Sequence, residues 1–405
     1  MKRYYYFFLT ICILLTECQS RASNDVKNDY YTIDFEQCIE KEKPMLLSEI
    51  ADSIEYIELK TPEDIIISDI TNIIPLNEDL FICAREGDWM QRGVYQFRRD
   101  GQYVKRIGST GWNIGEYVMA NDFQIDIEKE EVIIMDPVKI CYYDFNGKHL
   151  RSTIPQTSYM KTSIGISNSI LWINIAPRMF RTKVEHIATA ITYNENYDSV
   201  ATLLNPFFET ITPDSSNLDY IHRLPAFYHK NGLLYYKPNH SYDTLWQISG
   251  KNKEIYAFIN MGKYKLPLEY ERWYSSVEFE KFSHNYWAIK IIAEDDRYIF
   301  FLAESRNPNK LRKNNYIVYD KKKKRGFTAK NKKDIKITDD IMFGPSVWPL
   351  WISEKYYMTT ITRDELQKKI EDGNYSPSEP LNSQFSRIGE NDNDIIILCH
   401  KKIDM

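Results

Sequence analysis

Arginine and tryptophan side chains recur in the longest segments between the apolar runs of this sequence. Arg85 and Arg92 flank Trp89, and Trp112 lies in the next long segment. A guanidinium group binds carboxylate, sulfate or phosphate through two parallel hydrogen bonds, and an aromatic face stacks on sugar rings or peptide side chains. We expect these residue types to bind a polar or anionic partner, which could be a glycan, a peptide or an envelope protein. The full candidate set is Arg85, Trp89, Arg92, Trp112, Arg178, Arg181, Arg306 and Arg312.

Acidic residues are interspersed with these cations and leave a second interpretation open. They include Glu86, Asp88, Glu116 and Glu304. Carboxylates at these positions could neutralise the arginines locally. The cations would then be ordinary residues scattered over surface loops.

Sequence motifs of catalysis and cofactor binding are absent from the chain. It contains no G-x-x-x-x-G-K-[ST], G-x-S-x-G, H-E-x-x-H or EF-hand pattern. His222, His229 and His240 fall in one repeat unit, but their spacing matches no compact metal-ligand motif. The sequence therefore assigns no catalytic residue, no metal and no cofactor. Cysteines after Cys18 are widely spaced and are expected to be buried apolar residues.

The densest charge cluster is the basic run KKKKR at residues 321–325, which lies in a predicted tight turn. Such a run can form an electrostatic patch for anionic glycans, lipid headgroups or nucleic acid. Its turn position favours the simpler interpretation, a solvated hairpin tip. The formal net charge of -5, from 52 basic and 57 acidic residues, argues against a nucleic-acid binder.

The amino terminus has the pattern of a signal peptide. Lys2 and Arg3 precede a largely apolar stretch at residues 7–16, which is too short to span a bilayer. The sequence LTEC that follows resembles a bacterial lipobox, although Glu17 replaces the usual small residue. It predicts that Cys18 is lipidated and becomes the first residue of the mature chain.

Lipidation at Cys18 would make the protein an outer-membrane lipoprotein that faces the periplasm or the cell surface, and the lipid would be its only membrane contact. Cleavage after Ala22 would instead give a soluble periplasmic protein. The expected organisation is a signal peptide at residues 1–22, a tether and extended lead-in at 23–44, and a folded domain at 45–405.

Short alternating apolar runs separated by polar turns dominate the folded domain. The 30 Tyr, 19 Phe and 8 Trp residues favour strands over helices. The first unit has runs at residues 70–75, 80–84, 93–97 and 103–107, and an Asp100-Gly101 turn typical of a β-hairpin. Further units cover residues 123–154, 163–204, 221–259 and 286–329, and a sixth begins near residue 346. Units of this length with four strands each are typical of propeller blades.

The sixth unit lacks a strand, whereas residues 53–59 form a strand without a unit of their own. Pairing residues 53–59 with the last run, at residues 394–401, would close the ring without an exposed edge. We therefore expect an all-β, six-bladed β-propeller of four-stranded antiparallel blades, with short helical insertions such as one that opens at Thr362. The alternative, a pair of β-sandwiches, does not explain the recurring turn.

Three stretches carry a resemblance to a known family: residues 45–61, 94–117 and 391–402. They resemble the Bacteroidota six-bladed β-propeller lipoproteins, which are NHL-like in blade pattern and largely uncharacterised. That family has a loop of the form G-x-G-P-G-E-Y. Gly111, Gly115, Glu116 and Tyr117 match it, whereas residues 112–114 differ. The resemblance implies the fold and an exported lipoprotein, and it implies no catalytic residue.

The connections in a four-stranded meander sort into two ends. The tight turns meet at one end, and the longer segments meet at the other end, here called the long-loop face. These longer segments are residues 85–92, 108–119, 176–184, 265–283, 304–314 and 362–393. Rigid scaffolds commonly carry function in their long loops. The predicted function is a cell-envelope binding or scaffold module that uses this face. The alternatives are a propeller hydrolase or lyase with a metal or polar site at the channel mouth, and a purely structural envelope protein.

Overall fold

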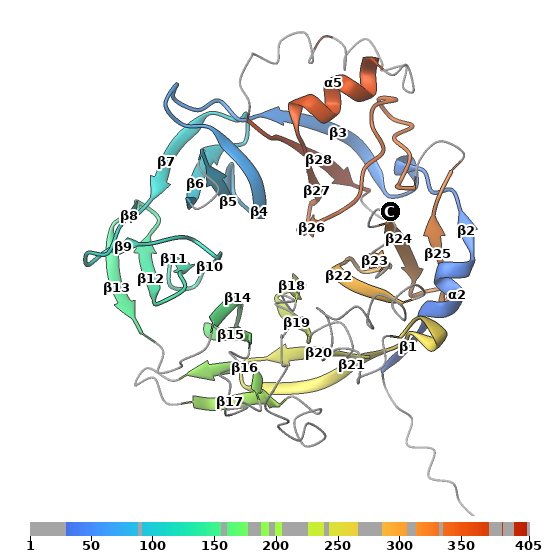
Figure 1. Cartoon of the computed structure of the whole chain (residues 1–405), viewed down its shortest axis with the longest axis horizontal. Coiled ribbons are helices and arrows are strands. Elements are labelled where there is room, and N and C mark those ends of the chain that lie inside the picture. Colours follow the sequence, from blue (N-terminus) through green and yellow to red (C-terminus); the bar gives the residue numbers. More distant parts are fainter. Residues whose placement is uncertain are drawn as a thin grey trace, which may run out of the picture. The chain divides into compact units, whose positions relative to one another are not determined.

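The computed structural model describes residues 30–87, 91–154, 160–176, 188–193, 199–204, 226–238, 243–265, 286–305, 313–331, 335–371, 383 and 393–402. Nearly all of them lie in the unit Thr32–Met405. Within this unit six sheets follow one another around a ring, which is the predicted six-bladed β-propeller (Figure 1).

The first three blades are simple four-stranded antiparallel meanders. Blade 1 comprises β4 (Ile67–Leu76), β5 (Asp79–Glu86), β6 (Arg92–Arg98) and β7 (Tyr103–Ile107). Blade 2 comprises β10 (Asp122–Asp126), β11 (Glu131–Met135), β12 (Ile140–Asp144) and β13 (His149–Thr153). Blade 3 comprises β14 (Met160–Ser167), β15 (Ile170–Ala176), β16 (Ala188–Tyr193) and β17 (Ser199–Leu204). The Asp100-Gly101 and Asn146-Gly147 hairpins predicted from the sequence are confirmed, since each glycine has a positive φ.

Blades 4 and 5 each gain a fifth strand from the amino-terminal lead-in. Blade 4 comprises β18 (Ala226–Lys230), β19 (Leu233–Lys237), β20 (Thr244–Ser249) and β21 (Asn252–Asn260), with β1 (Tyr31–Asp34) beside β21 and the short 3-10 helix η2 (Gly262–Tyr264) after it. Blade 5 comprises β22 (Trp287–Glu294), β23 (Tyr298–Ser305), β24 (Asn314–Asp320) and β25 (Arg325–Ala329), with β2 (Glu42–Lys43) parallel to β25. Helix α2 (Phe35–Glu40) joins the two added strands, and Asp34 caps it by accepting a hydrogen bond from Gln37 N at 3.0 Å.

Blade 6 closes the ring with strands from both ends of the chain. It comprises β26 (Trp351–Ile352), β27 (Tyr356–Ile361), β28 (Ile395–Lys401) and β3 (Ala51–Glu58). The register runs from Ile395 opposite Glu58 to His400 opposite Ser53, so the predicted pairing of the two terminal strands is confirmed. Helix α5 (Arg363–Glu371) lies between β27 and β28, and Thr362 Oγ1 accepts a hydrogen bond from Glu365 N at 3.1 Å, as the predicted cap requires.

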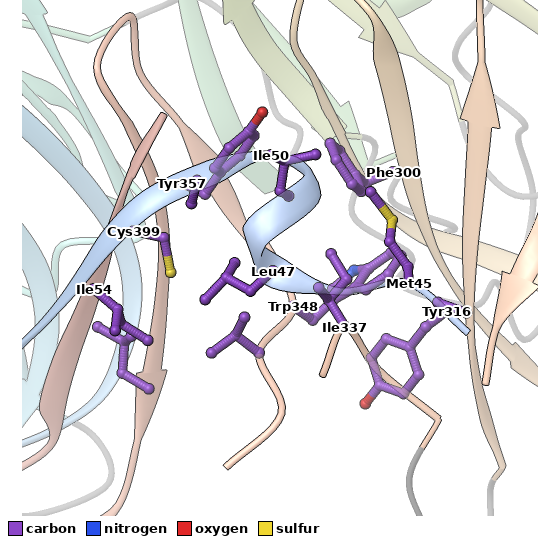
Figure 2. Close-up of a cluster of buried hydrophobic side chains, with 14 of the residues drawn as sticks. Met45, Leu47, Ile50, Ile54, Phe300, Tyr316, Ile337, Trp348, Tyr357 and Cys399 are labelled. Carbon is purple, nitrogen blue, oxygen red and sulfur yellow. The ribbon is translucent and has the colours of Figure 1, made fainter. Parts of the chain in front are cut away.

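The segment before β3 packs into the core between blades 5 and 6 (Figure 2). Met45, the 3-10 helix η1 (Leu47–Glu49) and Ile50 contribute apolar side chains to a cluster that includes Phe300 of blade 5 and Tyr357 of blade 6. These side chains are almost completely buried. The amino-terminal segment therefore contributes to the closing blade both a strand and buried apolar side chains of its core.

The cysteines in the described residues are free and buried, as the sequence predicts: Cys38, Cys83, Cys141 and Cys399. Burial raises the pKa of the Cys38 and Cys83 thiols to about 12, so both stay protonated at neutral pH. Thiols in this state pack as small apolar side chains.

A buried network of charges and hydroxyls joins blades 4, 5 and 6 at the tight-turn end. The Glu294 carboxylate, which is fully buried, accepts hydrogen bonds from Lys321 Nζ at 2.5 Å and from Tyr228 at 2.8 Å. The next residue, Asp295, accepts one from the Tyr357 hydroxyl at 2.5 Å. Burial lowers the pKa of the Lys321 ammonium. The expectation that residues 321–325 form a solvated tip is therefore wrong for Lys321, because Glu294 draws its side chain inward.

Gly101, in the hairpin between β6 and β7 of blade 1, packs against the closing strand β3. Its φ is +85°, and a Cβ atom there would overlap the carbonyl oxygen of Glu58 in β3. Gly232 also has a positive φ, of +73°, but no heavy atom lies within 4 Å of a Cβ built there. We expect Gly232→Ala to cost about 1 kcal/mol of unfolding free energy from backbone strain, and Gly101→Ala to cost about 3 kcal/mol. Urea unfolding measures both variants, and equal losses would show that β3 does not pack tightly at this point.

Candidate functional site

The structure brings two of the predicted binding residues together. Arg85 at the end of β5 lies directly opposite Arg92 at the start of β6. Trp112 lies in the loop that joins blades 1 and 2, between β8 and β9. The other predicted residues fall outside the described part of the chain: Cys18, Trp89, Arg178, Arg181, Arg306 and Arg312.

Each arginine has a partner on strand β4 of the same blade. Arg92 Nη2 lies 2.8 Å from Asp69 Oδ2, and Arg85 Nε donates to Ser68 Oγ at 3.3 Å. The register of β4 against β5 shifts between Ser68 and Asn72, and Asp69 within this bulge has a φ of +49°. The bulge therefore sets a carboxylate beside two like-charged residues that would otherwise repel each other. Sequence analysis did not identify Asp69 as a partner, because a bulge leaves no signal in the apolar pattern.

Trp112 and Ile114 project from a short closed loop. Two short strands, β8 (Ser109–Thr110) and β9 (Glu116–Tyr117), pair in parallel at its base, and Figure 1 shows them between blades 1 and 2. The Trp112 side chain is 77% exposed and the Ile114 side chain is 93% exposed. Large apolar side chains this exposed, two residues apart, form a small projecting apolar tip. Ile114 could not be singled out from the sequence, because its exposure depends on the loop geometry.

Blade 1 fixes the base of this loop through Tyr117 and Arg106. The buried Tyr117 hydroxyl donates to Ile107 O at 2.9 Å and accepts from Val94 N at 3.3 Å. Arg106 Nη1 lies 2.7 Å from Glu86 Oε2, and the same guanidinium contacts the Thr110 hydroxyl. Burial raises the pKa of Tyr117, which stays neutral and holds both hydrogen bonds.

Blade 2 and the loop itself fix the tip. Lys139 Nζ donates to Asn113 O at 3.2 Å, and the Tyr143 hydroxyl donates to Gly115 O at 3.1 Å. The Glu116 carboxylate accepts from Asn113 N at 2.9 Å and lies where a Cβ atom of residue 111 would be. The matching residues Gly111, Gly115, Glu116 and Tyr117 thus build the frame of the loop. Residues 112–114, which lie between these matching residues, are the ones that the frame displays.

Asp122, at the start of β10, is a half-buried carboxylate that joins three blades. Its oxygens accept from Asn72 Nδ2 at 3.0 Å in blade 1, from its neighbour Phe123 N at 2.8 Å, and from Ile164 N at 3.0 Å in blade 3. Burial nevertheless raises the pKa of its carboxyl from 3.8 to about 6. Sequence analysis did not identify Asp122, since nothing in its local sequence distinguishes a bridging carboxylate from a turn residue.

Of the three histidines in the fourth unit, His229 is described, and His222 and His240 lie outside the described residues. His229 Nε2 is 2.8 Å from Ile166 O, and burial lowers the pKa of its imidazole. This geometry is that of an interblade hydrogen bond. In the described part of the chain no three His, Cys, Asp or Glu side chains cluster as metal ligands would, and no helix is long and apolar enough to cross a membrane.

These features define a six-bladed β-propeller in which a rigid loop and an arginine pair lie on the long-loop face. The chain belongs to the family described as Domain of unknown function (DUF4934), whose match covers residues 30–400. No curated protein matches the chain.

Among solved structures, the chain is similar to a Bacteroides fragilis protein described as a "putative exported protein". The two share 15% sequence identity over 92% of this chain and 100% of that chain, with a TM-score of 0.69, a likeness that shows the fold alone. Virginiamycin B lyase from Staphylococcus aureus (10% identity, 65% of this chain and 73% of that chain, TM-score 0.34) is far more distant. So is the WD40 domain of Neurospora crassa Pan2 (11% identity, 70% and 73%, TM-score 0.35).

The raised pKa of Asp122 gives a pH-dependent stability. The folded protein holds the Asp122 proton more tightly than the unfolded chain does. As the pH rises from about 4 to about 6, this group's contribution to the unfolding free energy therefore decreases, and above about pH 6 it is constant. A pKa raised from 3.8 to about 6 corresponds to about 3 kcal/mol. We expect Asp122→Asn to remove this dependence, as measured by urea unfolding at a series of pH values. Wild-type and variant curves that run parallel from about pH 4 to about pH 6 would contradict the assignment.

Proposed function

We propose that this protein is an exported cell-envelope module that binds a polar or anionic partner, such as a glycan, a peptide or another envelope protein, on its long-loop face. The observation that carries the proposal is the loop at residues 108–117, which is hydrogen-bonded to both flanking blades and yet exposes Trp112 and Ile114. When the backbone that carries a side chain is already held in place, little backbone conformational entropy is lost on binding. Each contact of that side chain then contributes more to the affinity. Aromatic side chains with this property are typical anchors of binding surfaces.

Arg85 and Arg92 give the same face a polar component. Arg92 is half-buried in its ion pair with Asp69 and keeps part of its guanidinium exposed. An anionic group could compete with Asp69 for the outer N–H groups, as bidentate arginine contacts do. The partner favoured by this arrangement has an apolar or ring-shaped part for Trp112 and an acidic or hydroxyl-rich part for the arginines.

The proposed location is the cell envelope, with a lipid anchor at Cys18. The signal-peptide pattern and the LTEC sequence support export and lipidation, and the similar Bacteroides fragilis protein is described as exported. The resemblance to Bacteroidota propeller lipoproteins agrees with this location.

The lipid anchor predicts a change in fractionation. Cys18→Ala should move the protein from the membrane pellet to the soluble fraction, because the thiol that carries the acyl groups is lost. Metabolic labelling with a fatty acid, read on wild type and variant, measures the modification itself. A wild-type chain that never takes up label would exclude the anchor and favour cleavage after Ala22.

Binding to glycan and peptide arrays tests the long-loop face. We expect the double variant Trp112→Ala with Arg92→Ala to lose binding by about tenfold or more, the effect of removing one buried anchor. Ile255→Ala is the matched control, because Ile255 is an exposed apolar residue on strand β21 of blade 4, away from the long-loop segments of blade 1. Binding that survives the double variant and is lost on neutralising residues 323 and 325 would place the site at the tight-turn end and refute the proposed face.

A further inference from the structure

A small pocket of about 80 Å³ lies between the amino-terminal lead-in and blade 5. Four cationic side chains line it: Lys41, Lys43, Lys323 and Arg325. Since a single water needs roughly 10–15 Å³ of such space, the pocket has room for one compact oxyanion group or a few waters. It lies beside the turn at residues 321–324, at the opposite end of the blade from the long-loop face.

The fold brings these cations together from two distant parts of the chain. Strand β2 runs parallel to β25, with Lys43 opposite Ala329. Thr328 N donates to Lys41 O at 2.8 Å, and Lys330 N donates to Lys43 O at 3.1 Å. Residues two apart in an extended segment point to the same side, so Lys41 and Lys43 share one wall of the pocket.

The two acids in the pocket, Glu49 and Asp320, offset only part of the charge of its four cations. Asp320 is nearly buried and is already paired with Arg297 at 3.5 Å and Lys323 at 3.7 Å. Glu49 Oε1 accepts a hydrogen bond from Leu46 N at 3.1 Å. In the described chain neither Lys41 nor Arg325 has an ion-pair partner, and the Lys43 ammonium lies over the Phe327 ring, 5.0 Å from its centroid. The pocket therefore keeps an excess of positive charge.

The remaining lining favours a strong interaction with an anion. Met45, Tyr298 and Phe327 form buried, largely apolar walls, which weaken the screening of charges by water. Burial raises the pKa of Tyr298 to about 12, so at neutral pH its hydroxyl is protonated and available as a donor.

We propose that this pocket binds a terminal phosphate group, carried by a lipid headgroup or free in solution. Lysine and arginine donors on two walls would surround the phosphate oxygens, which is the chemistry that both side chains commonly provide. The site is separate from Arg85, Arg92 and Trp112 and does not depend on the function proposed for them.

The test is isothermal titration of the mature chain at constant ionic strength, first with inorganic phosphate and then with water-soluble dihexanoyl phosphatidic acid. The variant is Lys41→Gln with Arg325→Gln, which removes two exposed cations that have no ion pair to lose among the described residues. The matched control is Lys322→Gln with Lys324→Gln, which makes the same charge change in the turn before β25, outside the pocket. Thermal unfolding of both variants verifies that they fold.

We expect the pocket variant to weaken phosphate binding by about tenfold or more, the loss that corresponds to one charge-assisted hydrogen bond, and the control to retain it. Equal affinity for both ligands assigns the site to free phosphate groups, whereas tighter binding of phosphatidic acid assigns it to a lipid headgroup. The proposal is overturned if the wild-type protein binds neither ligand, or if the control variant loses as much phosphate affinity as the pocket variant. Trp112→Ala should leave phosphate binding unchanged, so the two proposed sites fail or succeed separately.

Discussion

The hydrogen-bonded pairing of β3 with β28 is the constraint on which the rest of the molecule depends. A ring of sheets has no free edge only if its last blade is complete, and here the last blade borrows a strand from the amino-terminal part of the chain. The closure carries more than backbone hydrogen bonds. Because β3 follows Met45, Leu47 and Ile50, pairing it with β28 also inserts these side chains between blades 5 and 6.

The junction of blades 4, 5 and 6 is held differently from a purely apolar core. Glu294 is buried with Lys321 and two tyrosine hydroxyls, and Asp295 is held by Tyr357 of the closing blade. Removing one partner of such a buried pair typically costs about 3–5 kcal/mol, because the other charge is left without compensation. The geometry of the network requires the blades to meet in one register. The network therefore makes the closure specific for this register, whereas the apolar cluster stabilises the closure without selecting a register.

A rigid ring leaves its connecting segments free to differ in shape and charge. On the long-loop face, the frame built by Arg106, Glu116 and Tyr117 fixes a loop whose tip makes no contribution to the core. At the other end, the lead-in lies along blade 5 and adds Lys41 and Lys43 to the basic turn. The two ends of the propeller thus offer chemically different surfaces, one aromatic and mixed in charge, the other small and cationic.

The sequence by itself determined the meander strands of the blades, the hairpins at Gly101 and Gly147, the number of blades and the closing pair, but not the added strands β1 and β2. These depend on local signals, namely alternation of apolar residues and glycines that accept positive φ at residues 101 and 147. The closing pair needed one step more, the matching of two leftover strands. The arginines on either side of the loop at residues 87–91 could likewise be placed together, since a hairpin makes its flanking residues neighbours.

Only the tertiary structure decided which charged and apolar side chains are exposed. Lys321 is inside because Glu294 meets it from the preceding hairpin, and Trp112 is outside because Tyr117 and Tyr143 anchor the loop beneath it. Lys41 and Arg325 share a pocket because β2 pairs with β25, two strands from distant parts of the chain. Contacts of this kind join side chains of different strands and blades, and local periodicity carries no record of which side chain from another strand will lie opposite.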